Sequence, residues 1–246
     1  MRLLAVDIGN TRISQGLYDG NRLLRRFDTP NEDRAEAFAR EAVGCGLCVV
    51  SRVSRSAADF EKFLTDTLSY RVVTLTQADV PFRIHYSAQL GSDRLANAFA
   101  ARRYAPQGAI VIDLGTATHF DIVDERGDFY GGPIHAGIQT LHDALSMRIP
   151  HLPQEPLHRV ESVVVENTIE AMNAGALYAT AGAIEKISAE IRRQFGANFK
   201  TILTGGNATF IRPILDVDFE VPNLTLEGLH AFGMQMMRKS GVRVSA

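Results

Sequence analysis

The sequence predicts an α/β protein built from two related halves, and two observations support this fold class. Apolar, strand-like segments alternate with helical segments along the 246 residues, which is typical of domains that layer helices on a sheet. The strand that ends in Asp-Ile-Gly-Asn-Thr at residues 7–11 also has a relative that ends in Asp-Leu-Gly-Thr-Ala-Thr at 113–118. Each copy continues into another strand and a turn. We therefore predict an N-terminal half over 1–91 and a C-terminal half over 92–246.

The elements that follow each repeated loop are predicted from the spacing of apolar residues and from helix-end signals. Ser92 and Asn167 are suitable helix N-caps, and Gly196 follows the longest helical pattern. The proline-rich stretch 149–160 is incompatible with a helix interior. The predicted helices cover 32–44, 56–68, 92–105, 168–195 and 225–241; predicted strands cover 47–53 and 71–76; and 199–211 is predicted as a strand, a Gly-Gly turn and the start of a helix.

Composition and charge exclude several classes of protein. A hydrophobic content of 46% supports a globular core, and a net charge of −2 leaves no basic excess for binding nucleic acid. No apolar run reaches the roughly 18 residues that indicate a membrane span, and Asp7 in the first strand argues against a signal peptide. Cys45 and Cys48 form a CxxC, but no second ligand pair accompanies them, so we interpret both as core thiols. We expect a cytoplasmic protein.

The two repeated loops have the composition of a phosphate-binding site. Gly9 and Gly115 would let backbone amides approach an anion, and neighbouring threonine hydroxyls add donors. Asp7 and Asp113 would repel a phosphate directly, so they favour a cation between carboxylate and phosphate. A single loop of this kind is better explained as an ordinary tight turn. Two copies, with a Gly-Gly pair at 205–206 after a later strand, favour a nucleotide site.

Longer blocks of the sequence resemble a known family. The blocks are DIGNTRI at 7–13, GSDRLANA at 91–98, DLGTATHFDIVDERGDFYGGPIHAGI at 113–138, NTIEAMNAGALYATAG at 167–182 and TGGNA at 204–208. They resemble type III pantothenate kinase, a family of the acetate and sugar kinase, heat-shock 70 and actin superfamily, and their order matches over nearly the whole chain. The resemblance implies an α/β fold of duplicated ribonuclease-H-like (actin-like ATPase) halves, with mixed sheets flanked by helices.

The resemblance also implies an activity and its requirements. The activity is transfer of the ATP γ-phosphate to pantothenate, which is the first step of coenzyme A biosynthesis. The requirement is a monovalent cation, K⁺ or NH₄⁺. We expect Mg²⁺ to accompany the nucleotide and a homodimer to form through the central helices of the C-terminal half.

Site residues follow from the resemblance position by position. Asp93 matches the catalytic base, and Asp113 matches the ligand of the monovalent cation. The residues that match ATP contacts are Asp7, Ile8, Gly9, Asn10, Thr11, Arg12, Ile13, Ser14 and Thr116. The residues that match pantothenate contacts are Tyr86, Gly91, Ser92, Asp93, Arg94 and Thr168.

The chain departs from the family pattern at two positions near these residues. Ser92 stands where the family has alanine, and His119 stands where it has the second threonine of Gly-Thr-Ala-Thr-Thr. Without the resemblance, Asp93 and Arg94 would be read as ordinary charges of a helix start. Two other functions stay open: a kinase of the same superfamily that acts on another small alcohol, such as a sugar, and a non-catalytic regulatory or accessory homologue.

Overall fold

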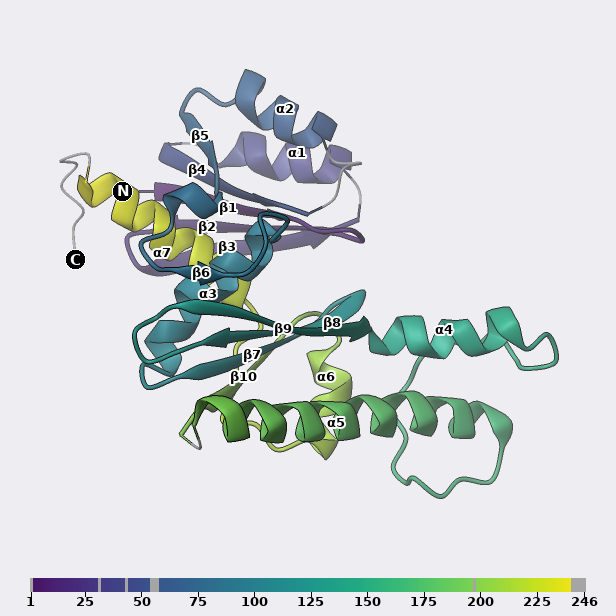
Figure 1. Cartoon of the computed structure of the whole chain (residues 1–246). Coiled ribbons are helices and arrows are strands. Elements are labelled where there is room, and N and C mark those ends of the chain that lie inside the picture. Colours follow the sequence, from purple (N-terminus) through teal and green to yellow (C-terminus); the bar gives the residue numbers. More distant parts are fainter. Residues whose placement is uncertain (1, 31, 43, 54–57, 197, 240–246) are drawn as a thin grey trace. The chain divides into compact units, whose positions relative to one another are not determined.

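The computed structural model describes residues 2–30, 32–42, 44–53, 58–196 and 198–239. The chain forms two compact units, one from Met1–Ala101 with Asn223–Ala246 and the other from Arg102–Pro222. Each unit contains a mixed sheet with helices packed on it (Figure 1), which confirms the predicted α/β class. The boundary between residues 91 and 92, which the sequence predicts for the duplicated halves, stays a prediction.

The sheet of the first unit has the strand order β3-β2-β1-β4-β5. The pairs β1–β2 and β2–β3 are antiparallel, whereas β4 runs parallel to β1 and β5 runs parallel to β4. The register places Asp7 of β1 between Ser14 of β2 and Ser51 of β4. The strands of this unit are β1 (Arg2–Ile8), β2 (Ile13–Asp19), β3 (Arg22–Thr29), β4 (Cys45–Arg52), β5 (Arg71–Thr74) and the short β6 (Ile84–His85).

Helices cover both faces of the first unit's sheet, and β1 is therefore buried on both of its sides. On one face, Leu4, Val6 and Ile8 share a core with apolar residues of the first two helices. On the other face the C-terminal helix lies so close that a Cβ on Gly233 would come within 2.3 Å of Leu3 Cδ1. The helices are α1 (Glu32–Glu41), α2 (Ala58–Thr67), α3 (Ser92–Tyr104) and α7 (Leu224–Lys239), with a 3₁₀ turn η1 (Gln77–Asp79).

The sheet of the second unit repeats this topology. The five strands of the sheet that belong to this unit follow the order β11-β10-β7-β8-β9. The pairs β7–β8 and β8–β9 are antiparallel, whereas β10 runs parallel to β7 and β11 runs parallel to β10. Thus β7 corresponds to β1 and β8 to β2, as the repeated loop motif predicts, and β10 corresponds to β4. The strands are β7 (Ala109–Leu114), β8 (Ala117–Val123), β9 (Phe129–Ala136), β10 (Lys200–Thr204) and β11 (Phe219–Glu220).

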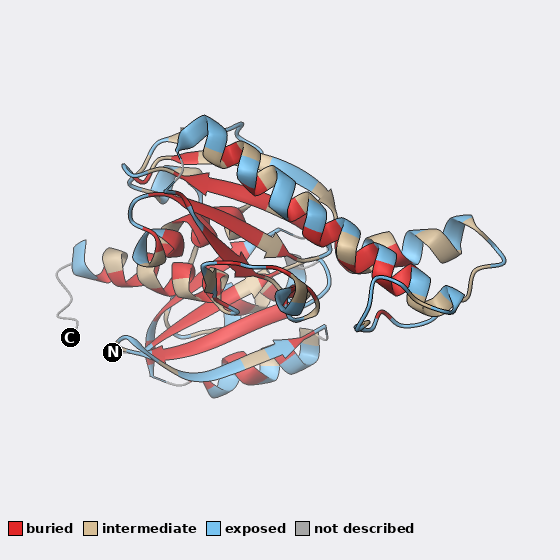
Figure 2. Ribbon diagram, turned by 90° about the horizontal axis from the view of Figure 1, so that it is seen from below, coloured by how far each residue is buried: buried red, intermediate tan, exposed pale blue. Residues whose placement is uncertain are grey.

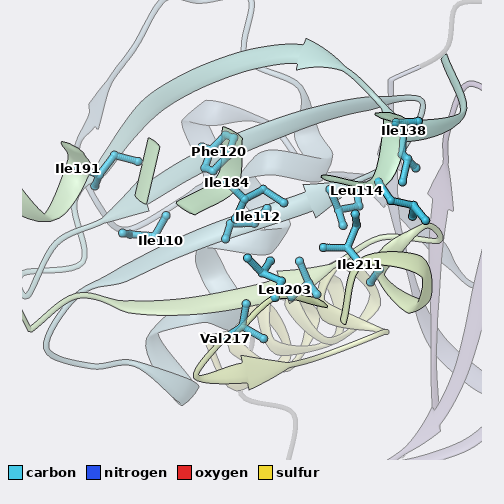
Figure 3. Close-up of a cluster of buried hydrophobic side chains, with 14 of the residues drawn as sticks. Ile110, Ile112, Leu114, Phe120, Ile138, Ile184, Ile191, Leu203, Ile211 and Val217 are labelled. Atoms are coloured by element: carbon cyan, nitrogen blue, oxygen red, sulfur yellow. The ribbon is translucent and has the colours of Figure 1, made fainter. Parts of the chain in front are cut away.

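The core of the second unit lies between this sheet and a long helix. Figure 3 shows Ile110, Ile112 and Leu114 of β7 together with Ile184 and Ile191 of that helix in one buried apolar cluster. The first half of the helix, the helix before it and the segment that joins them extend past the sheet as an arm, on which exposed and intermediate residues lie beside buried ones in Figure 2. The helices are α4 (Ile138–Arg148), α5 (Thr168–Phe195) and α6 (Ala208–Ile211), followed by the 3₁₀ turn η2 (Arg212–Ile214).

Most predicted elements are present within one to four residues at each end. Asn167 caps α5, since its side chain accepts a hydrogen bond from Glu170 N–H, and Gly196 is the C-cap. The stretch 149–160 forms no helix, and Cys45 and Cys48 are buried in β4 as free thiols. Helix α4 was not predicted, although Ile138, Leu141 and Leu145 follow a helical spacing. Of its residues only Ile138 and His142 are buried. Predicted helix residues 43, 56–57 and 240–241 lie outside the described residues. None of the described helices is both long and apolar enough to span a membrane.

Candidate active site

The first repeated loop joins β1 to β2 as a tight turn. Gly9 N–H donates to Arg12 O at 3.0 Å, so this amide closes the turn and does not face outward. A Cβ on Gly9 would lie 3.1 Å from the same oxygen, which is why a glycine is suited here. Asn10, Thr11 and Arg12 at the tip are exposed. The loop therefore presents the backbone of its tip and the Thr11 hydroxyl to a ligand, as a phosphate-binding turn requires.

The predicted catalytic carboxylate lies in the first turn of α3. Asp93 Oδ1 accepts a hydrogen bond from Arg94 N–H at 2.8 Å. A Cβ on Gly91 would lie 2.4 Å from this same oxygen, so the glycine leaves the space that the carboxylate occupies. Both the hydrogen bond and the positive end of the helix dipole favour a negative charge at this point. Asp93 is only partly buried, so its carboxylate is held in place and still accessible.

Ser92 joins the start of α3 to the end of β4. Arg52 N–H donates to Ser92 Oγ at 2.8 Å, and the hydroxyl has two acceptors at 3.2 Å, Ser51 Oγ and Arg52 O. The sequence predicted Ser92 as the N-cap of this helix. In the structure Ser92 is instead the first helical residue, and its hydroxyl is bonded to residues at the end of β4. Because Ser51 lies opposite Asp7 in the sheet, these contacts bring the start of α3 to the edge from which the first loop emerges.

Arg94 and Tyr86, both predicted to contact pantothenate, contact each other. The guanidinium carbon of Arg94 lies 5.0 Å from the centroid of the Tyr86 ring, a cation–π distance. Arg94 is 6% exposed, so it is not the solvated helix charge that the residues alone suggested. Tyr86 is 40% exposed. The aromatic ring therefore covers the cation on one side and is itself partly open to solvent.

The second repeated loop joins β7 to β8 with a similar but shorter closing contact. Gly115 N–H donates to Ala117 O, two residues on, at 3.1 Å, whereas Gly9 N–H donates to Arg12 O, three residues on. Thr116 is exposed at the tip. Thr118, by contrast, is fully buried, so its hydroxyl is not presented to a phosphate in the way the sequence pattern indicated. Asp113, at the end of β7, is largely buried, with 15% of its side chain exposed.

Residues distant in sequence hold the second loop in place. Thr140 Oγ1 of α4 donates to Thr116 O at 2.8 Å. Asn207, after β10, donates through its backbone to Leu114 O at 3.0 Å and through Nδ2 to Gly115 O at 3.2 Å. Sequence reasoning missed both supporting residues. The TGGNA block could have drawn attention to Asn207, whereas Thr140 belongs to a helix that was not predicted.

Two glycines complete the surroundings of the second loop. Gly205 has a φ of +91°, and a Cβ there would lie 2.5 Å from Asp113 Oδ1. A Cβ on Gly137 would lie 2.3 Å from Gly115 O. Side chains at these two positions would therefore displace the carboxylate of Asp113 and the loop backbone. The Gly-Gly turn that the sequence predicted thus lies beside Asp113.

His119 lies between two carboxylates on one face of the β7–β8 pair. It is directly opposite Asp113 in the register. Its Nε2 is 3.6 Å from Asp113 Oδ2, and its Nδ1 is 3.3 Å from Asp121 Oδ2. Asp121 is fully buried, and His119 has 12% of its side chain exposed. The residue that departs from the family pattern is therefore in direct contact with the predicted cation ligand.

The predicted site residues are divided between the two units. The first loop, Tyr86 and the Gly91–Arg94 segment belong to the first unit, and Asp113, Thr116 and Thr168 belong to the second. Thr168 is the first residue of α5, at the outer end of the arm and not beside the second loop (Figure 1).

Comparison with known proteins shows the family of the chain. A family model for type III pantothenate kinase matches residues 3–190. The chain belongs to the type III pantothenate kinase family. Relatives named type III pantothenate kinase include one from Parafrankia sp. (strain EAN1pec), 32% identical over 92% of this chain and 95% of the relative. Another, from Syntrophobacter fumaroxidans, is 34% identical over 92% of this chain and 95% of the relative.

Solved structures share the fold of this pantothenate kinase family member. A conserved protein from Campylobacter jejuni, assigned to the Baf family of transcriptional activators, is 20% identical, with a TM-score of 0.66 over 97% of this chain and 98% of that one. MreB5 of Spiroplasma citri bound to ADP is 12% identical, with a TM-score of 0.51 over 98% of both chains. These likenesses confirm the predicted actin-like ATPase fold.

Proposed function

We propose that this chain is an ATP-dependent pantothenate kinase that transfers the γ-phosphate to the hydroxyl of pantothenate and forms 4'-phosphopantothenate. Family membership supports the reaction. The observation that supports it within the chain is the start of α3, where the carboxylate of Asp93 occupies the space left by Gly91. The next residue, Arg94, is buried and contacts the ring of Tyr86. This arrangement combines a proton acceptor with a cation and an aromatic surface for a small polar acid.

Asp93 acts in this proposal as the general base. As the pantothenate hydroxyl attacks phosphorus, its proton passes to the Asp93 carboxylate, which a backbone hydrogen bond holds in one orientation. Arg94 would bind the carboxylate of pantothenate, because guanidinium groups pair well with carboxylates. Phosphoryl transfer depends mainly on positioning and on neutralising phosphate charge, so fixing the base and the acceptor is the main task of this segment.

The two repeated loops are proposed to bind the phosphates of ATP. Residues 7–14 and Thr116 would supply backbone amides and hydroxyls. Asp113 is a suitable ligand for a monovalent cation, K⁺ or NH₄⁺, because Gly205 leaves its carboxylate the space that a side chain would fill. That cation would offset phosphate charge, and Mg²⁺ would accompany the nucleotide.

The arm of the second unit supports the proposal of a homodimer. Met147, Val163 and Val164 expose 77%, 59% and 83% of their surface in the single chain. Burying such exposed apolar side chains against a second copy of the chain would be favourable. Thr168 begins α5 on the same arm, so it would serve a site that involves the partner. We also place the enzyme in the cytoplasm, where the two free thiols would stay reduced.

The test is ATP-dependent phosphorylation of labelled pantothenate in K⁺, NH₄⁺ and Na⁺ buffers, with Asp93→Asn beside the wild-type chain. We expect product with K⁺ or NH₄⁺ and a loss of at least about 100-fold in kcat for the variant. Wild-type turnover by the variant would refute the role of Asp93. A panel of other small alcohols tests the rival acceptors, and folded protein that phosphorylates none of them would be the non-catalytic homologue.

A further inference from the structure

Helix α7 meets the helix that carries Asp93 backbone to backbone. A Cβ on Gly228 would lie 1.8 Å from Ala96 O and 2.4 Å from Ala96 C, and both of these helix segments belong to the first unit. Backbone atoms of a helix cannot turn aside as the end of a side chain can, so this approach is possible only for a glycine. Glycine is less favourable than alanine in a helix interior. The contact with α3 therefore gives the reason for a glycine at position 228.

Helix α7 packs on the sheet through a second glycine. A Cβ on Gly233 would lie 2.3 Å from Leu3 Cδ1 of β1 and 2.9 Å from Val49 Cγ2 of β4. Gly233 comes five residues after Gly228, which turns it by about 140° around the axis of a helix with 3.6 residues per turn. The two glycines thus face different neighbours, and α7 lies between α3 and the strand that leads into the first loop.

A hydrogen bond to a buried side chain fixes the same contact. In the first turn of α7, Thr225 Oγ1 donates to Asn97 Oδ1 at 2.8 Å, and Asn97 is fully buried. The rings of Phe99 and Phe232 also meet edge to face, with centroids 6.0 Å apart. Residues four apart lie on the same side of a helix. Asn97 therefore meets α7 on the side of α3 that presents Asp93 one turn earlier.

The start of α3 is held at two points. Ser92 Oγ accepts a hydrogen bond from Arg52 N–H at the end of β4, and about one turn later the helix meets α7 at Ala96 and Asn97. Two anchors fix the direction of a helix as well as its place, and Asp93 lies between them. A change at either anchor would move its carboxylate relative to the first loop.

We propose that Gly228 and Thr225 are positioning residues for Asp93: through them, α7 sets where the proposed base lies relative to the first loop. The inference rests on the function proposed for Asp93. To reach a normal contact distance, the Cβ of Gly228→Ala would have to part the two helices by more than about 1 Å. A displacement of this size in a reacting group costs on the order of 100-fold in rate.

Steady-state kinetics below the melting temperature test the proposal. We expect Gly228→Ala to lower kcat for pantothenate phosphorylation about 100-fold, with the KM for ATP within about twofold of wild type, because the first loop stays on β1. Thr225→Val removes the hydroxyl at nearly constant volume and should lower kcat at least about fivefold, whereas Thr225→Ser keeps the donor and should stay within about twofold. In a chain that already carries Asp93→Asn, Gly228→Ala should cost no more than about twofold.

Arginine amides report the place of α3 without any assay of activity. Arg94 N–H donates to Asp93 Oδ1, and Arg52 N–H donates to Ser92 Oγ. A chain labelled with ¹⁵N-arginine therefore shows both contacts in its amide spectrum, and substituting each arginine with lysine assigns the two signals. We expect both signals to shift in the alanine variant at position 228 and in the valine variant at 225, and to keep their positions in the serine variant.

Met237→Ala is the control for lost stability. Met237 is buried on the same helix, nine residues after Gly228. Its truncation should lower the melting temperature, because it leaves a cavity, and should leave both kcat and the arginine signals unchanged. If Gly228→Ala does not fold, the valine and serine variants of Thr225 decide the question.

Three results would overturn the proposal. These are unshifted arginine signals in the folded alanine and valine variants, equal kcat for the valine and serine variants, and an equal loss of kcat in Met237→Ala. Wild-type protein that phosphorylates neither pantothenate nor another alcohol refutes the kinase function alone, because the arginine signals still report the place of α3. A chain that phosphorylates pantothenate and shows unshifted signals in the variants refutes the positioning role alone.

Discussion

Replacing Gly91 with alanine should move the carboxylate of Asp93, the proposed base, without disturbing the fold. The new Cβ would lie 2.4 Å from Asp93 Oδ1 and 3.5 Å from Asp93 Cγ, while its next neighbour, Val53 Cγ2, is at an ordinary 3.8 Å. The backbone of Gly91 is not in the left-handed region, so alanine adds no backbone strain. The carboxylate is the mobile end of a side chain, and it must shift by about 1 Å to reach normal contact distance.

A displacement of about 1 Å in a reacting group costs on the order of 100-fold in rate, which corresponds to about 2.7 kcal/mol in the activation free energy. We expect Gly91→Ala to lower kcat for pantothenate phosphorylation by about this factor, with the KM for ATP within about twofold of wild type and the melting temperature within a few degrees. Steady-state kinetics over both substrates and a thermal melt measure these quantities.

A double-mutant cycle provides the control for this prediction. If Gly91→Ala acts only by moving Asp93, then it should cost nothing more in a chain that already carries Asp93→Asn. The reasoning is refuted if Gly91→Ala retains kcat within about threefold of wild type. It is also refuted if the alanine lowers the residual rate of the Asp93→Asn chain by the same factor as in wild type, since the loss would then come from elsewhere.

Two further predictions concern the first unit. Ser92→Ala leaves Arg52 N–H without its hydroxyl acceptor, so we expect a loss of about 1–3 kcal/mol in the free energy of unfolding. The matched control is Ser146→Ala, a half-buried serine whose hydroxyl donates to Asp143 O within its own helix. Equal urea midpoints for the two variants would contradict the role given to Ser92. The other prediction concerns the two thiols, because burial raises the pKa of Cys45 to about 11 and raises the pKa of Cys48 as well. At pH 8, iodoacetamide should therefore modify the native chain far more slowly than the chain in urea. Rapid alkylation of the native chain would show that β4 opens in solution.

The repeated loops were predictable because each depends on a local pattern. An apolar strand, Asp-x-Gly and a following strand fix the turn, and both turns close through a glycine amide as this pattern requires. The resemblance of longer blocks then placed the predicted base at the start of a helix, where the structure has it. Helix α5 was predictable for the same reason, since its cap, apolar period and terminal glycine agree.

The supports of the site were not predictable, because they join segments that are distant in the chain. The hydroxyl of Ser92 bonds residues 40 and 41 positions earlier, and local rules assign such a serine to its own helix as a cap. Asn207 reaches Gly115 across 92 positions. The burial of Arg94 depends on Tyr86 folding over it, a tertiary contact that the local charge pattern does not reveal.

The matching topology of the two sheets shows how a duplicated architecture has diverged in the two copies. In each unit, a backbone amide that follows the parallel neighbour strand donates to the last carbonyl of the strand that precedes the loop. After β4, Val53 N–H donates to Ile8 O of β1 at 3.1 Å; after β10, Asn207 N–H donates to Leu114 O of β7 at 3.0 Å. Beyond this shared contact the two edges differ, since β4 also receives Ser92 and β10 leads into Gly205 beside Asp113. Under the proposed function these equivalent positions have separate tasks, so selection on acceptor recognition would act at one edge and selection on nucleotide affinity at the other.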